Sequence, residues 1–289
     1  MDARLEELLR LLDLERLEND LFRGDSRDIG SPQVFGGQVL GQALRAASAT
    51  VPAERAVHSL HAYFLRRGDF NTPIVYFVDR SRDGESFSSR RVTAIQHGEQ
   101  IFNLSASFQL AQAGVEHQEA APAVPPPESL HDSRSLPDSI MRHLPERARR
   151  FLERTRPFEF RPVQPQNWLQ PETAEPRQQV WVRAVDRLPD DDALHRSLLA
   201  YVSDYNLLMT ACRPHALSPW LGNVIMATID HAMWFHRACR VDEWLLYATD
   251  SPSASGARGY ARGTLYNREG VLVASTAQEG LMRAVEPTG

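Results

Sequence analysis

Residues 34–50 read VFGGQVLGQALRAASAT, and their apolar positions recur with the spacing of an α-helix. Runs with the alternation and β-branched content of strands follow this helix, at residues 56–66, 72–80, 87–96 and 100–109. The turn His97-Gly98-Glu99 joins the last two runs as a hairpin. This order predicts one helix followed by an antiparallel sheet.

The same order of elements returns farther along the chain. Residues 195–212, HRSLLAYVSDYNLLMTAC, predict a second helix, and strand-like runs follow at 223–237, 243–250, 259–266 and 271–279. An offset of 170 residues superposes the apolar pattern of the two stretches without gaps from His61 to Ser105. Such self-similarity indicates an internal duplication. We therefore expect an α+β protein in which two tandem antiparallel sheets each wrap a central helix.

Proline marks the boundary between the two repeats. Eleven of the 19 prolines fall between Pro122 and Pro176, and proline lacks an amide donor and disrupts regular helix. A helical pattern near residues 139–155 interrupts this stretch. We expect an N-terminal domain at 1–115, a proline-rich linker with a short helix at 116–178, and a C-terminal domain at 179–289.

Composition excludes several classes of protein. The net charge of −5 over 289 residues leaves no overall positive field for nucleic acid or anionic lipid. The chain contains no lysine, which excludes a phosphate-loop lysine and a lysine that forms a Schiff base. No apolar run approaches the ~20 residues that span a bilayer, and residues 1–20 have the pattern of an acidic amphipathic helix rather than a targeting segment. We expect a cytoplasmic protein that binds neither nucleic acid nor membrane.

Motifs for metals and for nucleophilic catalysis are missing from the sequence. Two cysteines cannot form a zinc knuckle. His231 and His236 lie five residues apart in a strand-like run and would face opposite sides of a sheet. The sequence contains no G-x-S-x-G, H-E-x-x-H or G-x-G-x-x-G pattern. We expect no metal and no organic cofactor, so side chains alone must activate water.

Long motifs are spread over both repeats: FRGDS (22–26), VFGGQVLGQAL (34–44), HSLHAYFLRRGD (58–69), RDGESFSSRRVTAIQHG (82–98), ATIDHAMWFHR (227–237) and VASTAQEGLMR (273–283). These segments resemble bacterial acyl-CoA thioesterase II, the TesB family. The resemblance extends nearly end to end and is weakest in the proline-rich linker. It implies a double hot-dog fold, hydrolysis of acyl-CoA thioesters without a cofactor, and a homodimer or homotetramer.

Asp204 is the most informative polar residue. It lies within the predicted helix at 195–212, and helical spacing gives it the apolar neighbours Ala200, Tyr201, Leu207 and Leu208. A carboxylate on an apolar face costs on the order of several kcal/mol unless it is paired or hydrogen-bonded. The residues alone leave two interpretations open. Either the carboxylate is functional, or it is structural. In the second case it accepts hydrogen bonds from backbone amides or reaches solvent at a helix end.

Thr228 and Gln278 are less distinctive by themselves. Thr228 suits a strand, in which alternation would place it on one face with Met226 and Asp230. Gln278 ends an apolar row of the last strand, so its amide points either into a site or toward solvent. The resemblance implies that Asp204, Thr228 and Gln278 together hold the attacking water, and this favours a catalytic Asp204.

Comparison of the repeats predicts a single site. The offset of 170 aligns Thr228 with His58 and Gln278 with Phe108, and the helix at 34–50 contains no acid. His58 is the main rival as a base because histidine titrates near neutral pH, although a histidine that begins a strand is more often structural. We expect Asp204 to act and His58 to be dispensable.

Two functions other than thioester hydrolysis remain open at this point. A hot-dog hydratase or dehydratase acting on enoyl-CoA would need an acid–base pair, for which His58 or His231 could serve. A non-catalytic acyl-CoA-binding module would keep a pocket without the three polar residues. Coenzyme A carries phosphates that arginines bind, and the candidates are Arg66, Arg67, Arg90, Arg91, Arg258 and Arg262. Gly36 and Gly37 are expected to allow close packing or ligand approach.

Overall fold

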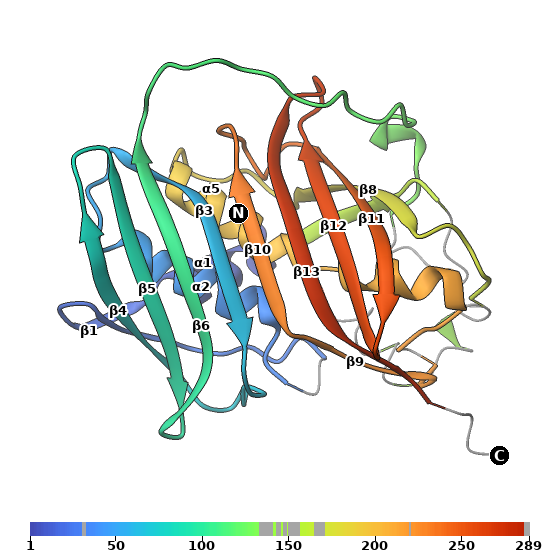
Figure 1. Cartoon of the computed structure of the whole chain (residues 1–289), viewed down its shortest axis with the longest axis horizontal. Coiled ribbons are helices and arrows are strands. Elements are labelled where there is room, and N and C mark those ends of the chain that lie inside the picture. The colour runs from blue at the N-terminus through green and yellow to red at the C-terminus, as the bar shows by residue number, and fades with distance from the viewer. Residues whose placement is uncertain are drawn as a thin grey trace.

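The computed structural model describes residues 1–30, 33–132, 141–142, 146, 149, 157–164, 171–219 and 221–285. In this part of the chain, a large antiparallel sheet carries helices α1 (Ala3–Leu12), α2 (Gly36–Ser48) and α5 (Asp192–Ser203) on one face (Figure 1). The helix predicted near residues 139–155 lies mostly outside the described residues. Within the described residues, no helix is long and apolar enough to cross a bilayer.

The first half of the chain forms the strands β1 (Glu15–Glu18), β2 (Leu21–Gly24), β3 (Arg55–Phe64), β4 (Ile74–Asp83), β5 (Phe87–Gln96) and β6 (Glu99–Leu110). Their order in the sheet is β1-β2-β4-β5-β6-β3. Helix α2 contacts β4, β5 and β6, and it buries an apolar face that includes Val39, Leu40, Ala43 and Leu44. The prediction of a helix followed by antiparallel strands is confirmed for this half.

The second half repeats this arrangement. After α5 and the 3-10 helix η2 (Leu208–His215), the chain forms β9 (Val224–Thr228), β10 (Asp230–Phe235), β11 (Leu245–Ser255), β12 (Arg258–Tyr266) and β13 (Leu272–Ala284). The earlier strands β7 (Phe158–Pro162) and β8 (Arg177–Ala184) complete the order β10-β13-β12-β11-β8-β7. The double hot-dog prediction is confirmed, with one addition. Strand β3 pairs with β10, so the two sheets are continuous.

The second helix is shorter than the sequence pattern predicts. Helix α5 ends at Ser203, and Asp204 is its C-cap. Asn206 then adopts a left-handed conformation with φ of 61°, which asparagine tolerates better than most residues, and the chain continues into η2. The expectation of one helix over 195–212 is therefore wrong. Asp204 lies at a helix end, where its side chain can reach neighbouring elements.

The pairing registers correct the predicted offset between the repeats. Irregularities of register recur in both halves, at Asp79/Arg82 and Ala94/Ile95 in the first and at Asp250/Ser253 and Leu265/Tyr266 in the second. Each pair of positions is 171 residues apart, so the offset of 170 is wrong by one. Because side chains alternate along a strand, a slip of one residue exchanges the two faces. His61 is accordingly exposed, whereas His231 is buried.

The corrected offset changes the counterparts of two predicted site residues. Val57 pairs with Phe108 in the first half, and Thr228 pairs with Gly280 in the second. The counterpart of Thr228 is therefore Val57 and not His58. The last hairpin is one residue longer in the second half, which raises the offset on β13 to 172. Gln278 consequently corresponds to Ala106 and not to Phe108.

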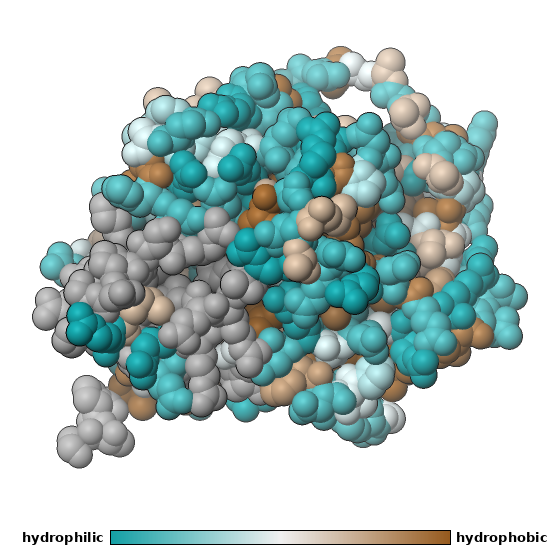
Figure 2. All heavy atoms as spheres, turned by 180° about the vertical axis from the view of Figure 1, so that it is seen from behind, coloured by the Kyte–Doolittle hydropathy of each residue, from teal (hydrophilic) through white to brown (hydrophobic). Residues whose placement is uncertain are grey.

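The two halves are related by a pseudo-two-fold axis at the β3–β10 seam. His61 pairs with Ala232, which is also its counterpart at an offset of 171. Helices α2 and α5 pack against each other in antiparallel fashion. Gly37 lies against the Tyr201 carbonyl and Gly41 against the Ser197 carbonyl. The start of α2 therefore meets the end of α5, where Asp204 is located. Viewed from behind, the described surface is mainly hydrophilic with scattered apolar patches (Figure 2).

Candidate active site

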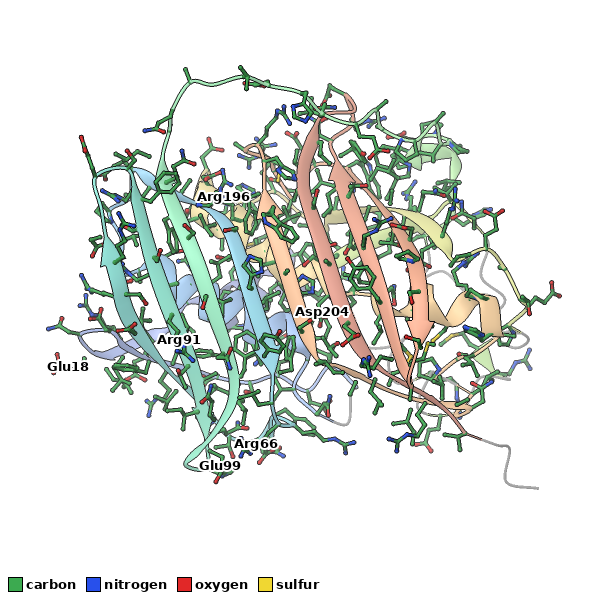
Figure 3. All side chains as sticks on the ribbon, viewed as in Figure 1. Glu18, Arg66, Arg91, Glu99, Arg196 and Asp204 are labelled. Carbon is green, nitrogen blue, oxygen red and sulfur yellow. The ribbon has the colours of Figure 1, made fainter. Side chains whose placement is uncertain are left out.

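Asp204 is held between the end of α5 and the start of α2. A Cβ on Gly36 would lie 2.7 Å from Asp204 Oδ2, and a Cβ on Gly37 would lie 2.2 Å from the Tyr201 carbonyl oxygen. Glycine is therefore required at both positions for this close packing. The Gly37 N–H donates a hydrogen bond to the carboxyl of Asp204, and the N-terminus of a helix favours negative charge. Figure 3 shows Asp204 near the boundary between the two halves.

Gln278 lies on the inner face of β13 and contacts Asp204 directly. Its side chain is 1% exposed, and Nε2 donates a hydrogen bond of 2.7 Å to Asp204 Oδ1. The same nitrogen lies 3.2 Å from His231 Nδ1. Ala274, Thr276 and Gln278 share the buried inner face of β13 as predicted, whereas Leu272 lies beyond a register irregularity and packs with Tyr266 in a separate cluster. The amide of Gln278 points into the molecule. Gln278 Oε1 is buried and has no hydrogen-bond partner in the described part of the chain.

A β-bulge at Ile229 sets the direction of the residues between β9 and β10. Thr228 pairs with Gly280, and Ala232 pairs with Ala277, so the β9–β10 side contains one extra residue. A bulge resets the alternation of side chains. Asp230 therefore does not share the inner face with Thr228, contrary to the simple alternation. His231 occupies that face instead and is 0% exposed.

A hollow of about 240 Å³ lies beside these groups. Its walls include the apolar residues Val34, Val39, Phe64, Ile101 and Phe102, together with Gly36, Ala227 and Thr228. The hollow therefore combines residues of both halves and ends against the glycine that contacts Asp204. The structure brings Asp204 and Gln278 into contact and places Thr228 on the adjacent wall.

Burial controls the protonation of the central groups. Removal from solvent raises the pKa of Asp204 above its ordinary value of 3.8, although hydrogen bonds from Gln278 and Gly37 act in the opposite direction. Burial also lowers the pKa of His231 to about 4 and raises that of the neighbouring Tyr247 phenol. A carboxylate with a raised pKa is a stronger base than an exposed one. Asp204 is therefore suited to take a proton from water.

His58 lies away from this cluster. It is half-buried, its Nε2 lies 2.8 Å from Ser107 Oγ, and its ring packs edge-on against Phe87. Ser107 and Phe87 belong to the outer face, opposite the helices, because their strand neighbours Ala106 and Ser88 are buried. The structure therefore does not bring His58 to Asp204.

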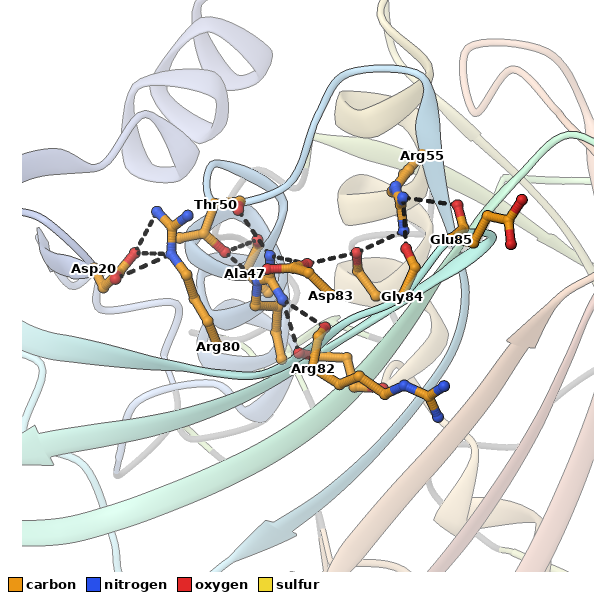
Figure 4. Close-up of polar contacts among 12 residues, drawn as sticks. Asp20, Ala47, Thr50, Arg55, Arg80, Arg82, Asp83, Gly84 and Glu85 are labelled. Carbon is orange, nitrogen blue, oxygen red and sulfur yellow. Dashed lines mark hydrogen bonds and ion pairs between the residues drawn. The ribbon is translucent and has the colours of Figure 1, made fainter.

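The six arginines predicted to bind the phosphates of CoA differ in the groups that they contact. Arg90 is 1% exposed and binds Thr50 and Asp83 in a structural cluster whose polar contacts appear in Figure 4. Arg258 pairs with Glu279, and Arg262 pairs with Asp250. Arg91 is exposed on β5 (Figure 3).

Arg66 and Arg67 line the hollow beside Thr228. Arg66 pairs with Glu99 at 2.9 Å, and both residues lie at the lower end of the first half in Figure 3. Arg67 is exposed and makes no ion pair with the described residues. Among the candidates, these two are therefore placed to meet a charged ligand at the hollow. The described residues contain no cluster of three or more His, Cys, Asp or Glu side chains that could hold a metal.

The continuous sheet around α2 and α5 defines a double hot-dog protein, with an acid, an amide and a hydroxyl at the helix junction. Residues 23–109 match the acyl-CoA thioesterase N-terminal domain, and residues 148–281 match the acyl-CoA thioesterase family. The chain belongs to the acyl-CoA thioesterase II family, TesB.

Individual relatives agree along nearly the whole length. Human acyl-coenzyme A thioesterase 8 is 43% identical over 98% of this chain and 90% of the relative. Acyl-CoA thioesterase 2 of Haemophilus influenzae is 40% identical over 99% of this chain and 100% of the relative. The crystal structure of acyl-CoA thioesterase II TesB2 from Mycobacterium marinum is similar with a TM-score of 0.79 and 43% identity, covering 98% of this chain and 99% of that chain.

Sequence reasoning missed how His231 and the start of α2 contribute to the site. The sequence pattern suggests for His231 only a metal ligand or an acid–base group of a hydratase, because a regular strand gives no sign that it contacts Gln278. The bulge at Ile229 carries no sequence signal that alternation could detect. The Gly36-Gly37 pair did signal close approach, and that expectation is confirmed by the packing against Asp204 and Tyr201.

Proposed function

We propose that this protein hydrolyses acyl-CoA thioesters to a free fatty acid and CoA with a water molecule that Asp204, Thr228 and Gln278 hold. The observation that carries the proposal is the direct bond of 2.7 Å from Gln278 Nε2 to Asp204 Oδ1, with Gln278 Oε1 left without a partner among the described residues. A buried acceptor without a partner is costly unless water or ligand satisfies it. Water is the ligand that thioester hydrolysis requires at this position.

The chemical steps follow from the proton states of the site. Asp204 takes a proton from the bound water, and the resulting hydroxide attacks the thioester carbon. Thr228 and Gln278 are neutral and fix the position of the water. The tetrahedral intermediate then loses the CoA thiolate, which receives the proton from Asp204. The first-turn amides of α2 are directed toward the same region and would stabilise the oxyanion.

Arg66 and Arg67 are proposed to bind the phosphates of CoA at the hollow beside Thr228. Arginine pairs with phosphate through charge-assisted hydrogen bonds, and Arg67 has no competing ion pair in the described chain. An acyl thioester of N-acetylcysteamine carries the reacting bond without phosphates. Arg67→Ala should therefore raise KM for acyl-CoA and leave KM for the short analogue unchanged, with the exposed Arg91→Ala as control. Equal effects on both substrates would contradict this role.

The experiment that tests the function is thiol release from an acyl-CoA, followed with a disulfide reagent. Hydrolysis produces one free thiol for each turnover. Hydration of an enoyl-CoA and simple binding of acyl-CoA produce none, so the assay separates the three functions considered from the sequence. Absence of thiol release across short, medium and long acyl chains would contradict hydrolysis.

We also propose a cytoplasmic homodimer or homotetramer, divided into domains at 1–115 and 179–289 with a linker at 116–178. Exposed aromatic side chains on the outer face of the sheet support self-association, among them Tyr63 (53% exposed) and Phe77 (48% exposed). The end of β6 at Leu110 supports the first boundary. Strand β7 (Phe158–Pro162) falls within the proposed linker and pairs with β8, so this part of the linker extends the sheet of the second half. Light scattering, cell fractionation and limited proteolysis test these three statements.

A further inference from the structure

His231 connects Gln278 to the last turn of α5. Its Nδ1 lies 3.2 Å from Gln278 Nε2, and its Nε2 lies 3.0 Å from Ser203 Oγ. The side chains of His231 and Ser203 are both 0% exposed. Both ring nitrogens are therefore used within the protein, and neither can reach a substrate directly.

Ser203 determines which ring nitrogen carries the proton. Ser203 Oγ lies 2.9 Å from the Ala200 carbonyl oxygen, which can only accept, so the single hydroxyl proton is donated there. Ser203 Oγ then accepts the Nε2–H of His231, and Nδ1 keeps a lone pair. Burial lowers the pKa of His231 to about 4, so the imidazole is neutral near pH 7.

The lone pair on His231 Nδ1 in turn fixes the orientation of the Gln278 amide. Gln278 Nε2 faces two acceptors, His231 Nδ1 and Asp204 Oδ1, and donates one N–H to each. A rotation of the amide by 180° would set Oε1 against both acceptors and lose both hydrogen bonds. Oε1 is therefore kept on the opposite side of the amide, where it has no partner in the described chain.

We propose that His231 is a positioning residue of the hydrolysis: it holds Gln278 so that Nε2 binds the Asp204 carboxylate and Oε1 accepts a hydrogen from the attacking water. Ser203 is the group that keeps His231 in the required tautomer. This inference rests on the proposed function and adds two residues to it. It assigns His231 no proton transfer to or from the substrate.

The role predicts an effect on the pH profile that packing alone would not produce. The hydrogen bond from Gln278 lowers the pKa of Asp204. Two titratable groups lie around the Asp204 carboxyl, His231 of β10 and Tyr247 of β11. Burial raises the pKa of the Tyr247 phenol, which therefore stays neutral. Helix α2 contributes only the uncharged Gly37 amide. When Gln278 is no longer oriented, the Asp204 pKa rises. The acid limb of kcat then moves to higher pH.

The first experiment replaces His231 by Leu and measures kcat, KM and the pH profile of kcat with acyl-CoA. We expect a loss of roughly 10²-fold in kcat, the scale for a group misplaced by about 1 Å, with little change in KM and an acid limb at higher pH. His231→Asn should recover part of kcat because its amide oxygen can accept from Gln278 near the position of Nδ1. His236→Leu is the matched control, since His236 also binds a serine hydroxyl through Nε2, at 2.8 Å from Ser275 Oγ, but is exposed.

A second experiment covers the case in which His231→Leu does not fold. Ser203→Ala leaves the imidazole in place but removes its proton acceptor, so both tautomers become populated. We expect a loss of roughly tenfold in kcat, equivalent to one hydrogen bond of about 1.4 kcal/mol, with the same displacement of the acid limb. Nitrogen NMR of labelled histidine should show the neutral Nε2–H tautomer in the wild type and a mixture in the variant.

The inference is overturned by a folded His231→Leu variant with wild-type kcat and acid limb, or by the same result for Ser203→Ala. Failure of the proposed function has a different signature. In that case the wild type releases no thiol, or Asp204→Asn retains full turnover. Failure of the His231 role alone leaves the wild type active, Asp204→Asn strongly impaired and the His231 and Ser203 variants unaffected.

Discussion

Gly36→Ala tests whether the junction of α2 and α5 sets the position of the Asp204 carboxylate. The added Cβ would lie 2.7 Å from Asp204 Oδ2 and 3.1 Å from Phe64 Cε1. Ordinary contact begins at 3.4 Å, so the carboxylate must retreat by the difference between 3.4 and 2.7 Å, about 0.7 Å. The atom that gives way is the end of a side chain and not backbone, so the fold should persist.

The expected magnitude follows from this displacement. A misplacement of about 1 Å in an active site costs roughly 10²-fold in rate, and on the same logarithmic scale 0.7 Å costs roughly 25-fold, or about 2 kcal/mol in activation free energy. The loss should appear in kcat, because the walls of the hollow are unchanged. Thermal stability should not fall, since alanine is favoured over glycine in a helix by up to ~1 kcal/mol.

The assay is thiol release under saturating acyl-CoA, combined with thermal unfolding of the same preparation. Gly41→Ala is the control, because its Cβ would meet Leu12 and the Ser197 carbonyl at 3.2 Å and does not approach Asp204. That variant should keep the wild-type kcat even if its stability changes. A folded Gly36→Ala variant with full kcat would refute the reasoning, as would an equal loss of kcat in Gly41→Ala.

The remaining predictions concern the acid and the two halves. Asp204→Asn should lower kcat by ~10²–10⁴, the range for general base catalysis, while calorimetry still detects acyl-CoA binding. After a single turnover of the wild type in heavy-oxygen water, the label should be in the fatty acid. Label in the peptide that contains Asp204 would indicate a covalent intermediate instead. The pKa of Asp204 is raised in the folded state by burial, so the folded protein holds this proton more tightly than the unfolded chain. The stability of the wild type relative to Asp204→Asn should therefore decrease as pH rises from the unfolded pKa of 3.8 through the folded pKa. Denaturant unfolding at several pH values measures this difference, and a relative stability that increased with pH would contradict the prediction. Gln278→Ala should lose much of kcat while His58→Ala retains most of it, and equal large losses in both would indicate a site shared with the outer face.

The order of the main elements could be read from the sequence, and the resemblance supplied the proposed site residues, but their geometry could not be predicted. Apolar periodicity located α2 and the strands β3 to β6 and β9 to β13, because burial of one face is a local property of the sequence, but it did not predict β1, β2, β7 or β8. The end of α5 was missed because the left-handed turn at Asn206 depends on how η2 packs against the sheet. The sequence pattern predicts Asp204 in the interior of a helix. In the structure it is the C-cap of α5, and its side chain contacts the start of α2.

Register was the second quantity that local pattern could not provide. The offset of 170 aligned apolar residues of the two halves, although a slip of one residue exchanges the two faces of a strand. The identity of His61 and His231 favoured the wrong alignment, although one side chain is exposed and the other buried. Only hydrogen-bonded pairing distinguishes the two, and it also reveals the bulge that turns His231 inward.

The seam between β3 and β10 has a consequence for the history of the chain. A pseudo-two-fold axis offers two equivalent positions for a site. The first half, however, carries Val57, Leu60 and Ala106 where the second carries Thr228, His231 and Gln278, and its helix α2 ends in the C-cap Ala49 where α5 ends in Asp204. After an ancestral gene fused to its own copy, each half could lose what the other retained. The first half carries no acid in α2 and supplies the glycine that contacts the carboxylate of the other half. The halves have become mutually dependent, so neither repeat expressed alone would contain both the acid and its seat.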